Sequence, residues 1–150
     1  MRPKLLKVSG LNSFVEEEVI DFSSLSKKGL FGIFGPTGSG KSSILDAVTI
    51  ALYGRISRDT KEFINKETEE LYVFFKFSLA EDNIYTVERK LKISDSGGYK
   101  TTLSRLVIKE DGREKIYDKV NEIDNKIEEI IGLNHQDFMR TVVLPQGKFS

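Results

Sequence analysis

The sequence predicts a mixed α/β fold in which an antiparallel meander packs beside a strand–loop–helix unit. Three observations support this prediction. Residues 35–42 read GPTGSGKS, a glycine-rich loop that ends in lysine and serine. An apolar run at 30–34 precedes this loop, and apolar residues at helical spacing follow it. Strand-prone runs separated by turn residues then extend from residue 70 to residue 108.

Three strands and a helix are expected in the first third of the chain. Two short strands cover 4–9 and 19–22, and the run 30–34 has the length and composition of a buried strand. The helix that follows the loop should stop near Gly54, because glycine tolerates the left-handed conformation of a helix end. Asp46 is expected on the polar side of this helix, opposite a stripe formed by Ile44, Leu45, Ala47, Val48, Ala51 and Leu52.

Three further strands are expected in series at 70–79, 84–93 and 102–108, joined by turns that contain Gly, Asn and Asp. Strands joined in this way form an antiparallel meander. A helix from about Asp118 follows, and a second helix covers 134–144. The apolar stripe of the first of these helices is too short for a coiled coil and should pack on the domain's own sheet; it comprises Val120, Ile123, Ile127 and Ile130, with Gly132 as the helix stop.

The loop at 35–42 is a complete G-x-x-x-x-G-K-[ST] phosphate-binding motif. Its glycines permit the backbone angles that turn successive N–H groups inward around a polyphosphate. Lys41 would reach the β- and γ-phosphates, and the Ser42 hydroxyl would ligate Mg²⁺. The start of the following helix adds free N–H groups and a partial positive charge. We therefore expect nucleoside triphosphate binding through Gly35, Pro36, Thr37, Gly38, Ser39, Gly40, Lys41, Ser42 and Ser43.

Composition limits the other classes of protein. The chain has no cysteine and no apolar run of about 18 residues, so neither a disulfide, a thiolate metal site nor a membrane span is expected. Lys and Arg number 23, as do Asp and Glu, so the total charge gives no argument for nucleic acid and any basic surface must be local. The lone His135 is expected at the surface or as a helix cap rather than as a metal ligand.

Residues 35–54, GPTGSGKSSILDAVTIALYG, resemble the phosphate-loop region of SbcC-type DNA double-strand-break-repair ATPases. These belong to the ABC-type ATPases with long coiled coils, alongside the SMC proteins. Residues 5–22 are similar to the family's opening strands, and residues 141–149, TVVLPQGKF, are similar to its Q-loop segment. The resemblance spans essentially the whole chain. It implies a P-loop NTPase fold of the ABC-ATPase head type, with 1–150 as the N-terminal lobe.

The resemblance also implies ATP and Mg²⁺ as cofactors and assigns roles to several residues. Gln146 would complete the Mg²⁺ shell and orient the attacking water. Lys41 and Gln146 are therefore the expected catalytic residues, and Ser42 and Gln146 are the expected metal ligands. Asn12, beside Ser13, stands where the family often has an arginine that reaches the phosphates. A further nucleotide-facing stretch corresponds to Ile64, Asn65 and Lys66.

The family's Walker B aspartate, catalytic glutamate and signature loop have no counterpart in the sequence, so the resemblance implies a separate C-terminal half. Without that half, this segment is expected to be inactive. Such heads dimerise around two nucleotides and work with an SbcD-type nuclease on DNA. The implied location is the cytoplasm, near the nucleoid, with no membrane partner. Candidate DNA contacts lie around the Gly112 turn, where acidic residues interrupt them, so a solvated hairpin tip is an equal alternative; they are Arg105, Lys109, Arg113, Lys115 and Lys119.

Two other classes of protein stay open at this point. The nucleotide-binding domain of an ABC transporter would carry an aromatic residue that stacks on adenine upstream of the loop, and a coupling surface after the Q-loop. A small P-loop kinase or GTPase would carry an N-K-x-D motif or an arginine-rich lid, and the sequence shows neither. The residues after Ser150 would separate the first two readings. Heptad repeats would favour the repair class, and a direct run to L-S-G-G would favour the transporter.

Overall fold

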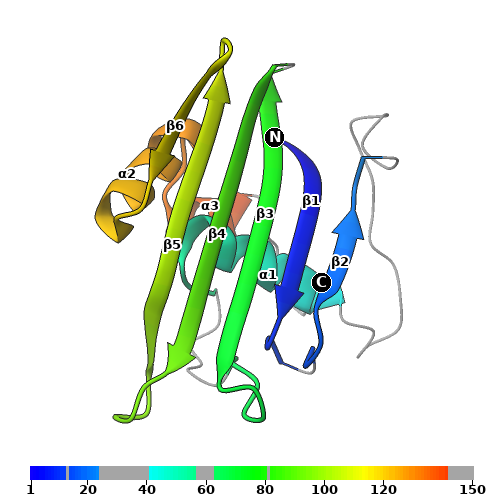
Figure 1. Cartoon of the computed structure of the whole chain (residues 1–150), viewed down its shortest axis with the longest axis vertical. Helices are drawn as coiled ribbons and strands as arrows, with labels where there is room; N and C mark the ends of the chain where they lie inside the picture. The colour runs from blue at the N-terminus through cyan, green and yellow to red at the C-terminus, as the bar shows by residue number, and fades with distance from the viewer. Residues whose placement is uncertain (13, 24–40, 57–62, 81, 142–150) are drawn as a thin grey trace.

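The computed structural model describes residues 1–12, 14–23, 41–56, 63–80 and 82–141. These form one antiparallel sheet with helices on one face, as Figure 1 shows. The strand order is β2-β1-β3-β4-β5-β6. The described strands are β1 (Arg2–Ser9), β2 (Glu18–Asp21), β3 (Glu70–Ala80), β4 (Asn83–Ile93), β5 (Tyr99–Glu110) and β6 (Arg113–Tyr117). The described helices are α1 (Lys41–Tyr53), α2 (Val120–Ile131) and α3 (His135–Thr141). The strand predicted at 30–34 lies outside the described residues.

Alternation of side chains builds the covered face of the sheet. On β3, every second residue from Leu71 to Phe77 is 0% exposed, and the residues between them are half-buried. In the register of β3 and β4, Phe75 lies opposite Val87 and Phe77 lies opposite Tyr85. The rings of Phe77 and Tyr85 stack with centroids 5.3 Å apart. Such cross-strand pairs are the main source of sheet stability, and the three predicted meander strands are confirmed.

The meander continues into a strand that the sequence prediction missed. After the turn at Gly112, β6 pairs antiparallel with β5 from Arg113 to Tyr117, so the meander has four strands rather than three. Three of the five residues of β6 are charged, and most of them are exposed. An edge strand takes its stability from pairing on one side and needs no buried face, so the apolar pattern carried no signal. The helix predicted from about Asp118 accordingly begins at Val120.

The orientation of α1 differs from the prediction at two residues. Leu45, expected in the apolar stripe, is 42% exposed, whereas Asp46, expected on the polar side, is 7% exposed. Most positions of α1 are apolar, so periodicity alone does not decide which stripe faces the sheet. The predicted stop is confirmed, because Gly54 has φ 73° and its N–H donates to the carbonyl oxygen of Ile50 at 2.7 Å.

The apolar stripe of α2 packs on the domain's own sheet, as predicted. Ile123 and Ile127 are 0% exposed, and Val120 at the start of the helix is 41% exposed. Gly132 ends α2 with φ 80°, and its N–H donates to the carbonyl oxygen of Glu128 at 2.8 Å. The second predicted helix is α3, and the last residues of its predicted range lie outside the described part of the chain.

The burial of α2 yields a test of the core. Ile127→Ala should lower the free energy of unfolding by about 2–5 kcal/mol, because it leaves a cavity between α2 and the sheet. Val120→Ala on the same helix should change it by about 0.5 kcal/mol or less. Urea denaturation followed by circular dichroism measures both. Equal losses for the two variants would contradict this packing of α2.

Candidate nucleotide-binding site

The start of α1 is where the phosphate-binding motif meets the described structure. α1 begins at Lys41, and the first N–H groups of a helix lack partners within it, so they can bind an anion. Residues 35–40 lie outside the described part of the chain, as do Ser13, Gln146 and the side chains of Lys41 and Ser42. The site is therefore built from the residues around the first turn of α1.

Backbone hydrogen bonds hold together two segments that are far apart in the chain. The N–H of Asn12 donates to the carbonyl oxygen of Phe63 at 2.8 Å, and the N–H of Asn65 donates to that of Gly10 at 2.7 Å. The residues between these bonds form an antiparallel bridge. Gly10 has φ 73°, and a Cβ atom there would lie 1.9 Å from the carbonyl oxygen of Glu70. Only glycine therefore permits this close approach.

Side chains extend this pairing to α1. Nδ2 of Asn65 donates to the carbonyl oxygen of Asn12 at 2.7 Å, and its Oδ1 accepts from the N–H of Glu67 at 2.8 Å. Asn12 has φ 51°, a left-handed conformation that asparagine tolerates better than most residues. Its Nδ2 donates to Oγ of Ser43, in the first turn of α1, at 3.1 Å. These bonds join Asn12, Ser43 and Asn65 into one network, which we call the asparagine network.

The predicted nucleotide-site residues differ in what they can offer a ligand. Ser43 is 8% exposed, and Asn12 and Asn65 are half-buried. A hydroxyl that accepts a hydrogen bond keeps its own proton for donation, so Ser43 can serve an anionic oxygen. Ile64 is 5% exposed and its side chain belongs to the core, which leaves only its backbone for a ligand. Lys66 is exposed.

Asp46 is a buried carboxylate that the sequence prediction placed on the solvent side of α1. It lies three residues after Ser43, so the two side chains share one side of the helix. A buried carboxylate is costly unless it is paired, and Asp46 does have an interaction partner. Its place one turn into the phosphate-loop helix makes it a candidate functional residue. The signal in the sequence was an acidic residue within an otherwise apolar helix.

The strand register separates the candidate DNA contacts. Arg105 and Lys109 alternate along β5 with the buried Leu106 and Ile108, so the two cations face away from the helices. In the register, Arg105 lies opposite Glu88 on β4, and Lys109 lies opposite Glu114 on β6. Lys109 Nζ is 3.5 Å from Oε2 of Glu114, a solvent-exposed ion pair of small energy. Lys115 lies opposite the buried Ile108, and therefore on the helix side of β6. Arg113 shares that side by alternation, and Lys119 precedes α2. The five cations do not form one surface.

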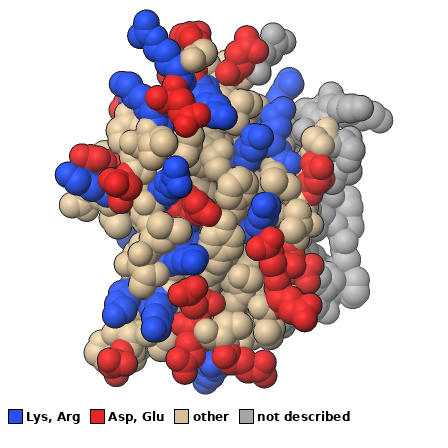
Figure 2. Space-filling model, viewed as in Figure 1, with Lys and Arg blue, Asp and Glu red and all other residues tan. Residues whose placement is uncertain are grey.

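The sheet face opposite the helices carries charges of both signs. Figure 2 shows Lys and Arg side chains interspersed with Asp and Glu among uncharged residues on this face. Some of the cations are engaged by aromatic rings, because Lys7 Nζ lies 5.1 Å from the ring centroid of Phe74 and Lys90 Nζ lies 6.0 Å from that of Tyr72. The Tyr72 hydroxyl in turn donates to Glu88. The face is thus a mixed charged surface rather than a basic patch.

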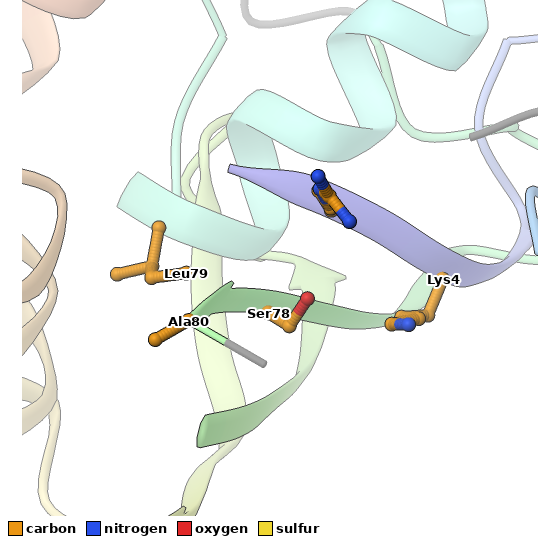
Figure 3. A pocket seen from close by; sticks show the side chains of 5 residues that line it. Lys4, Ser78, Leu79 and Ala80 are labelled. Atoms are coloured by element: carbon orange, nitrogen blue, oxygen red, sulfur yellow. The ribbon is translucent and has the colours of Figure 1, made fainter. Parts of the chain in front are cut away.

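Figure 3 shows a pocket of about 280 Å³, which lies near the start of β1. It is lined by Arg2, Lys4, Ser78, Leu79 and Ala80. Arg2 begins β1 and Gly10 follows its last residue, which separates pocket and network by about 25 Å at about 3.3 Å per residue. None of the predicted nucleotide-site residues lines this pocket.

His135, the lone histidine, packs against an aromatic ring and does not cap a helix. His135 is half-buried, and its ring lies edge-on to Tyr53 with centroids 5.5 Å apart. Burial and the nearby Arg55 lower the pKa of His135. The cap of α3 is instead Asn134, whose Oδ1 accepts from the N–H of Asp137 at 2.8 Å. Within the described residues, no three His, Asp or Glu side chains cluster to hold a metal ion, and no helix is long and apolar enough to span a membrane.

The family follows from comparison with known proteins. The model of a family described as an AAA domain matches residues 5–150. The chain belongs to this AAA domain family. A solved structure of the recombination mediator protein RecF with ATP superposes with a TM-score of 0.51 at 22% identity, over 81% of this chain and 29% of that one. That likeness concerns the fold alone, and it confirms the predicted α/β P-loop class with its antiparallel sheet.

Longer relatives confirm the resemblance to SbcC-type ATPases. The chain is 48% identical over 155 residues to the SbcC component of the nuclease SbcCD of Bacillus subtilis, which covers 100% of this chain and 14% of the relative. It is 37% identical over 154 residues to a probable DNA double-strand break repair Rad50 ATPase of Aquifex aeolicus, with 99% and 15% covered. The chain therefore spans about one seventh of the length of these relatives.

The asparagine network yields a test of the site in this AAA-family chain. Asn12→Ala removes the hydrogen bond to Ser43 and should weaken Mg·ATP binding by about two- to tenfold, the usual net value of one such bond. Asn125→Ala, at an exposed position on α2, is the matched control and should leave affinity unchanged. Isothermal titration calorimetry measures both. Wild-type affinity for Asn12→Ala would remove the network from the nucleotide site.

Proposed function

We propose that this chain is the N-terminal part of an ATP-binding head in a DNA double-strand-break-repair complex. With a C-terminal half, this head would hydrolyse ATP and gate an associated nuclease through ATP-driven head dimerisation. The observation that carries the proposal is the placement of the asparagine network. Three residues predicted for the nucleotide meet at the first turn of the helix that completes the phosphate-binding motif. The family and the names of the relatives support the repair function.

The residues around the start of α1 suit a polyphosphate. The glycine loop and the first N–H groups of α1 would surround the phosphate oxygens, and Lys41 would neutralise the β- and γ-phosphates. Ser43 would donate its hydroxyl proton while Asn12 holds the oxygen in place. Asn12 brings no charge, so the positive charge at this site comes from Lys41 and the start of α1.

The residues at the start of α1 also fit Mg²⁺. Mg²⁺ in phosphate sites usually takes one or two protein oxygens and completes its shell with phosphate oxygens and water. Ser42 stands at the second position of α1, beside the helix end that would receive the phosphates, and it would supply such an oxygen. The ion would neutralise charge that develops on the transferred phosphoryl group. Gln146 would add a second ligand and orient the attacking water.

Catalysis and assembly would depend on parts beyond this chain. Residues 1–150 would form the P-loop to Q-loop segment of the head, and the C-terminal half would supply the signature loop and Walker B residues. A second head would close the ATP sandwich, and an SbcD-type nuclease would be the partner, in line with the name of the Bacillus subtilis relative. The complex would act on DNA in the cytoplasm, near the nucleoid.

DNA contact is proposed for the open face of β5. Arg105 and Lys109 point to this face, whereas Arg113 and Lys115 point to the other. Lys109 can exchange its exposed ion pair with Glu114 for a phosphate at small cost. A duplex that lies on the open face would therefore be contacted by Arg105 and Lys109 and by neither Arg113 nor Lys115.

Two substitutions separate nucleotide binding from hydrolysis in the protein completed by its C-terminal half. Lys41→Ala should weaken Mg·ATP binding at least about tenfold, because it removes a charge-assisted contact. Gln146→Ala should leave the affinity of isolated heads nearly unchanged and lower turnover by about 10- to 1,000-fold, because it removes a positioning group. Calorimetry and steady-state phosphate release measure the two quantities.

Lys92→Ala, at an exposed position on β4, is the control for both variants and should match the wild type. Wild-type affinity for Lys41→Ala would refute the phosphate-loop assignment. Weakened affinity with unchanged turnover for Gln146→Ala would show that Gln146 is an ordinary loop residue.

Two double variants, each of which removes two positive charges, test whether the open face of β5 binds DNA. The double variant Arg105→Gln, Lys109→Gln should weaken DNA binding and lower the slope of log K against log salt by about 2, since each phosphate contact contributes about 0.9. The double variant Arg113→Gln, Lys115→Gln removes the same charge from the other side and should keep the wild-type slope. Fluorescence anisotropy over a salt series measures both. Equal slopes for the two double variants would exclude the open face of β5 from the interface.

A further inference from the structure

The start of β1 carries two cations that line one pocket. Arg2 and Lys4 line the pocket of about 280 Å³ together with Ser78, Leu79 and Ala80 at the end of β3. The lining side chains thus include two positive charges and no negative charge. Across the described ranges of the chain, neither Arg2 nor Lys4 forms an ion pair or a side-chain hydrogen bond. Both cations are therefore available to a ligand.

Two β-bulges lie at this pocket. In the pairing of β1 with β3, the register shifts between Pro3 and Leu5, so Lys4 is an extra residue without a partner. In the pairing of β3 with β4, Leu79 is the extra residue in the same way. A bulge bends its strand and redirects a side chain, and bulges are common beside functional sites. Both extra residues line the pocket.

Ser78 adds a hydroxyl group to the two cations. It follows Phe77, which is 0% exposed on the helix side of β3, so Ser78 belongs to the open face of the sheet. It is nevertheless only 4% exposed. Arg2 lies directly opposite Ser78 in the register, so the two side chains share this face. Figure 3 shows the Ser78 side chain between those of Lys4 and Ala80.

These three groups suit a phosphate. The guanidinium of Arg2 can donate two parallel hydrogen bonds to a phosphate, and the ammonium of Lys4 can act as a point charge beside it. The hydroxyl of Ser78 can donate to a further phosphate oxygen. The pocket is slightly smaller than the range of about 300–1,000 Å³ that is typical of drug-sized ligands, so it suits one phosphate group rather than a whole nucleotide.

The pocket lies in one row with a proposed DNA contact. Residues directly opposite one another on neighbouring strands form this row, in the order Arg2, Ser78, Ile84 and Lys109. Three strand spacings of about 4.8 Å separate the backbones of Arg2 and Lys109 by about 14 Å. Opposite residues share a face, so both side chains leave the sheet on the open face. Duplex DNA carries one negative charge per about 1.7 Å of its axis, so one duplex can reach both residues.

We infer that this pocket binds one backbone phosphate of a DNA duplex that lies on the open face of the sheet. The inference rests on the DNA contact proposed above for β5 and adds a second point of contact on β1 and β3. Arg2 and Lys4 would neutralise the phosphate, and Ser78 would donate to it. Phosphate contacts fix the orientation of a protein on a duplex and carry no sequence information. The pocket would therefore set where the duplex lies without selecting its sequence.

The double variant Arg2→Gln, Lys4→Gln tests the inference in the protein completed by its C-terminal half. It should weaken binding to a duplex oligonucleotide and lower the slope of log K against log salt by about 0.9, because the two cations serve a single phosphate. Ser78→Ala should weaken binding by about two- to tenfold through the lost hydrogen bond. It should keep the wild-type slope, since a hydroxyl carries no charge. Fluorescence anisotropy over a salt series measures each variant.

The double variant Arg113→Gln, Lys115→Gln is the charge-matched control and should keep the wild-type slope. All variants should keep the wild-type affinity for Mg·ATP, which shows that the fold is intact. A wild-type slope for the Arg2 and Lys4 variant, or an equal change in the control, would overturn the inference.

Inorganic phosphate separates a DNA phosphate from a free anion. Binding of inorganic phosphate that the Arg2 and Lys4 variant abolishes, combined with an unchanged DNA slope, would assign the pocket to a free anion and would overturn the inference. Failure of the wild-type protein to bind duplex DNA at all would instead overturn the proposed DNA function. The two failures are therefore distinguishable.

Discussion

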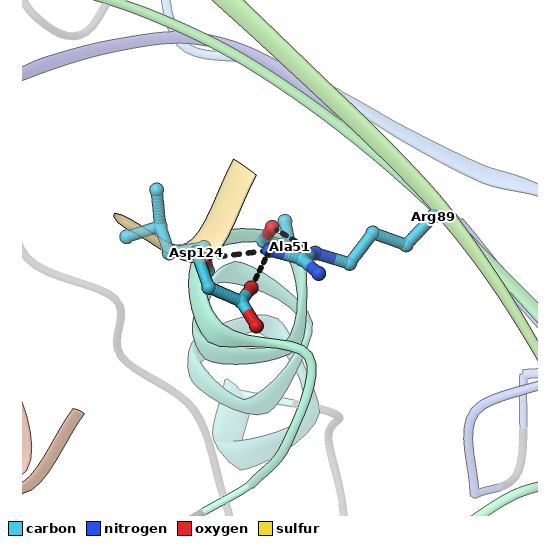
Figure 4. A network of polar contacts seen from close by, with 4 residues as sticks. Ala51, Arg89 and Asp124 are labelled. Atoms are coloured by element: carbon cyan, nitrogen blue, oxygen red, sulfur yellow. Dashed lines mark hydrogen bonds and ion pairs between the residues drawn. The ribbon is translucent and has the colours of Figure 1, made fainter. Parts of the chain in front are cut away.

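The hydrogen bonds of the buried Arg89 guanidinium are the interactions on which the placement of α1 and α2 against the sheet depends (Figure 4). A buried charge is tolerated only when it is paired and hydrogen-bonded, and Arg89 meets this condition with two carbonyl oxygens of α1 and the carboxylate of Asp124. Removal of one partner from such a group typically costs about 3–5 kcal/mol. The sheet therefore fixes the end of α1 through polar geometry as well as through apolar packing, which by itself is non-directional.

Different sets of contacts hold the two ends of α1. The C-terminal end is fixed to β4, α2 and α3 by Arg89 and Tyr53. The N-terminal end is fixed by Asn12, which donates to Ser43 and is itself held by Asn65. Between them, Ala47, Ile50 and Ala51 are 0% exposed and anchor the helix in the core. A rigid helix held at both ends keeps its free N–H groups in place, and a polyphosphate site requires such preorganised donors.

Much of the fold could be predicted from the sequence, because alternation on β3 and β4 and the helix stops at Gly54 and Gly132 are local signals. β6 was missed because a charged edge strand depends on its neighbour for stability. The side of α1 that faces the sheet was wrong at Asp46, because a mostly apolar helix has no clear polar face. Ser43 was expected from the phosphate-binding motif, whereas Asn12 and Asn65 came from family resemblance alone, since the hydrogen bonds that join the three residues span 31 and 53 positions of the chain. Arg89 had a usable signal: a charged residue in the core phase of an alternating strand.

Hydrogen exchange of backbone amides, with and without a non-hydrolysable ATP analogue and Mg²⁺, tests most directly whether the nucleotide binds at the start of α1. A nucleotide bound at the start of α1, beside the asparagine network, should slow exchange in residues 35–43, 10–12 and 63–66 of the protein completed by its C-terminal half. Exchange should stay unchanged at the pocket lined by Arg2 and Ser78, which lies at the other end of β1. Protection at that pocket with none at 35–43 would contradict this placement of the nucleotide.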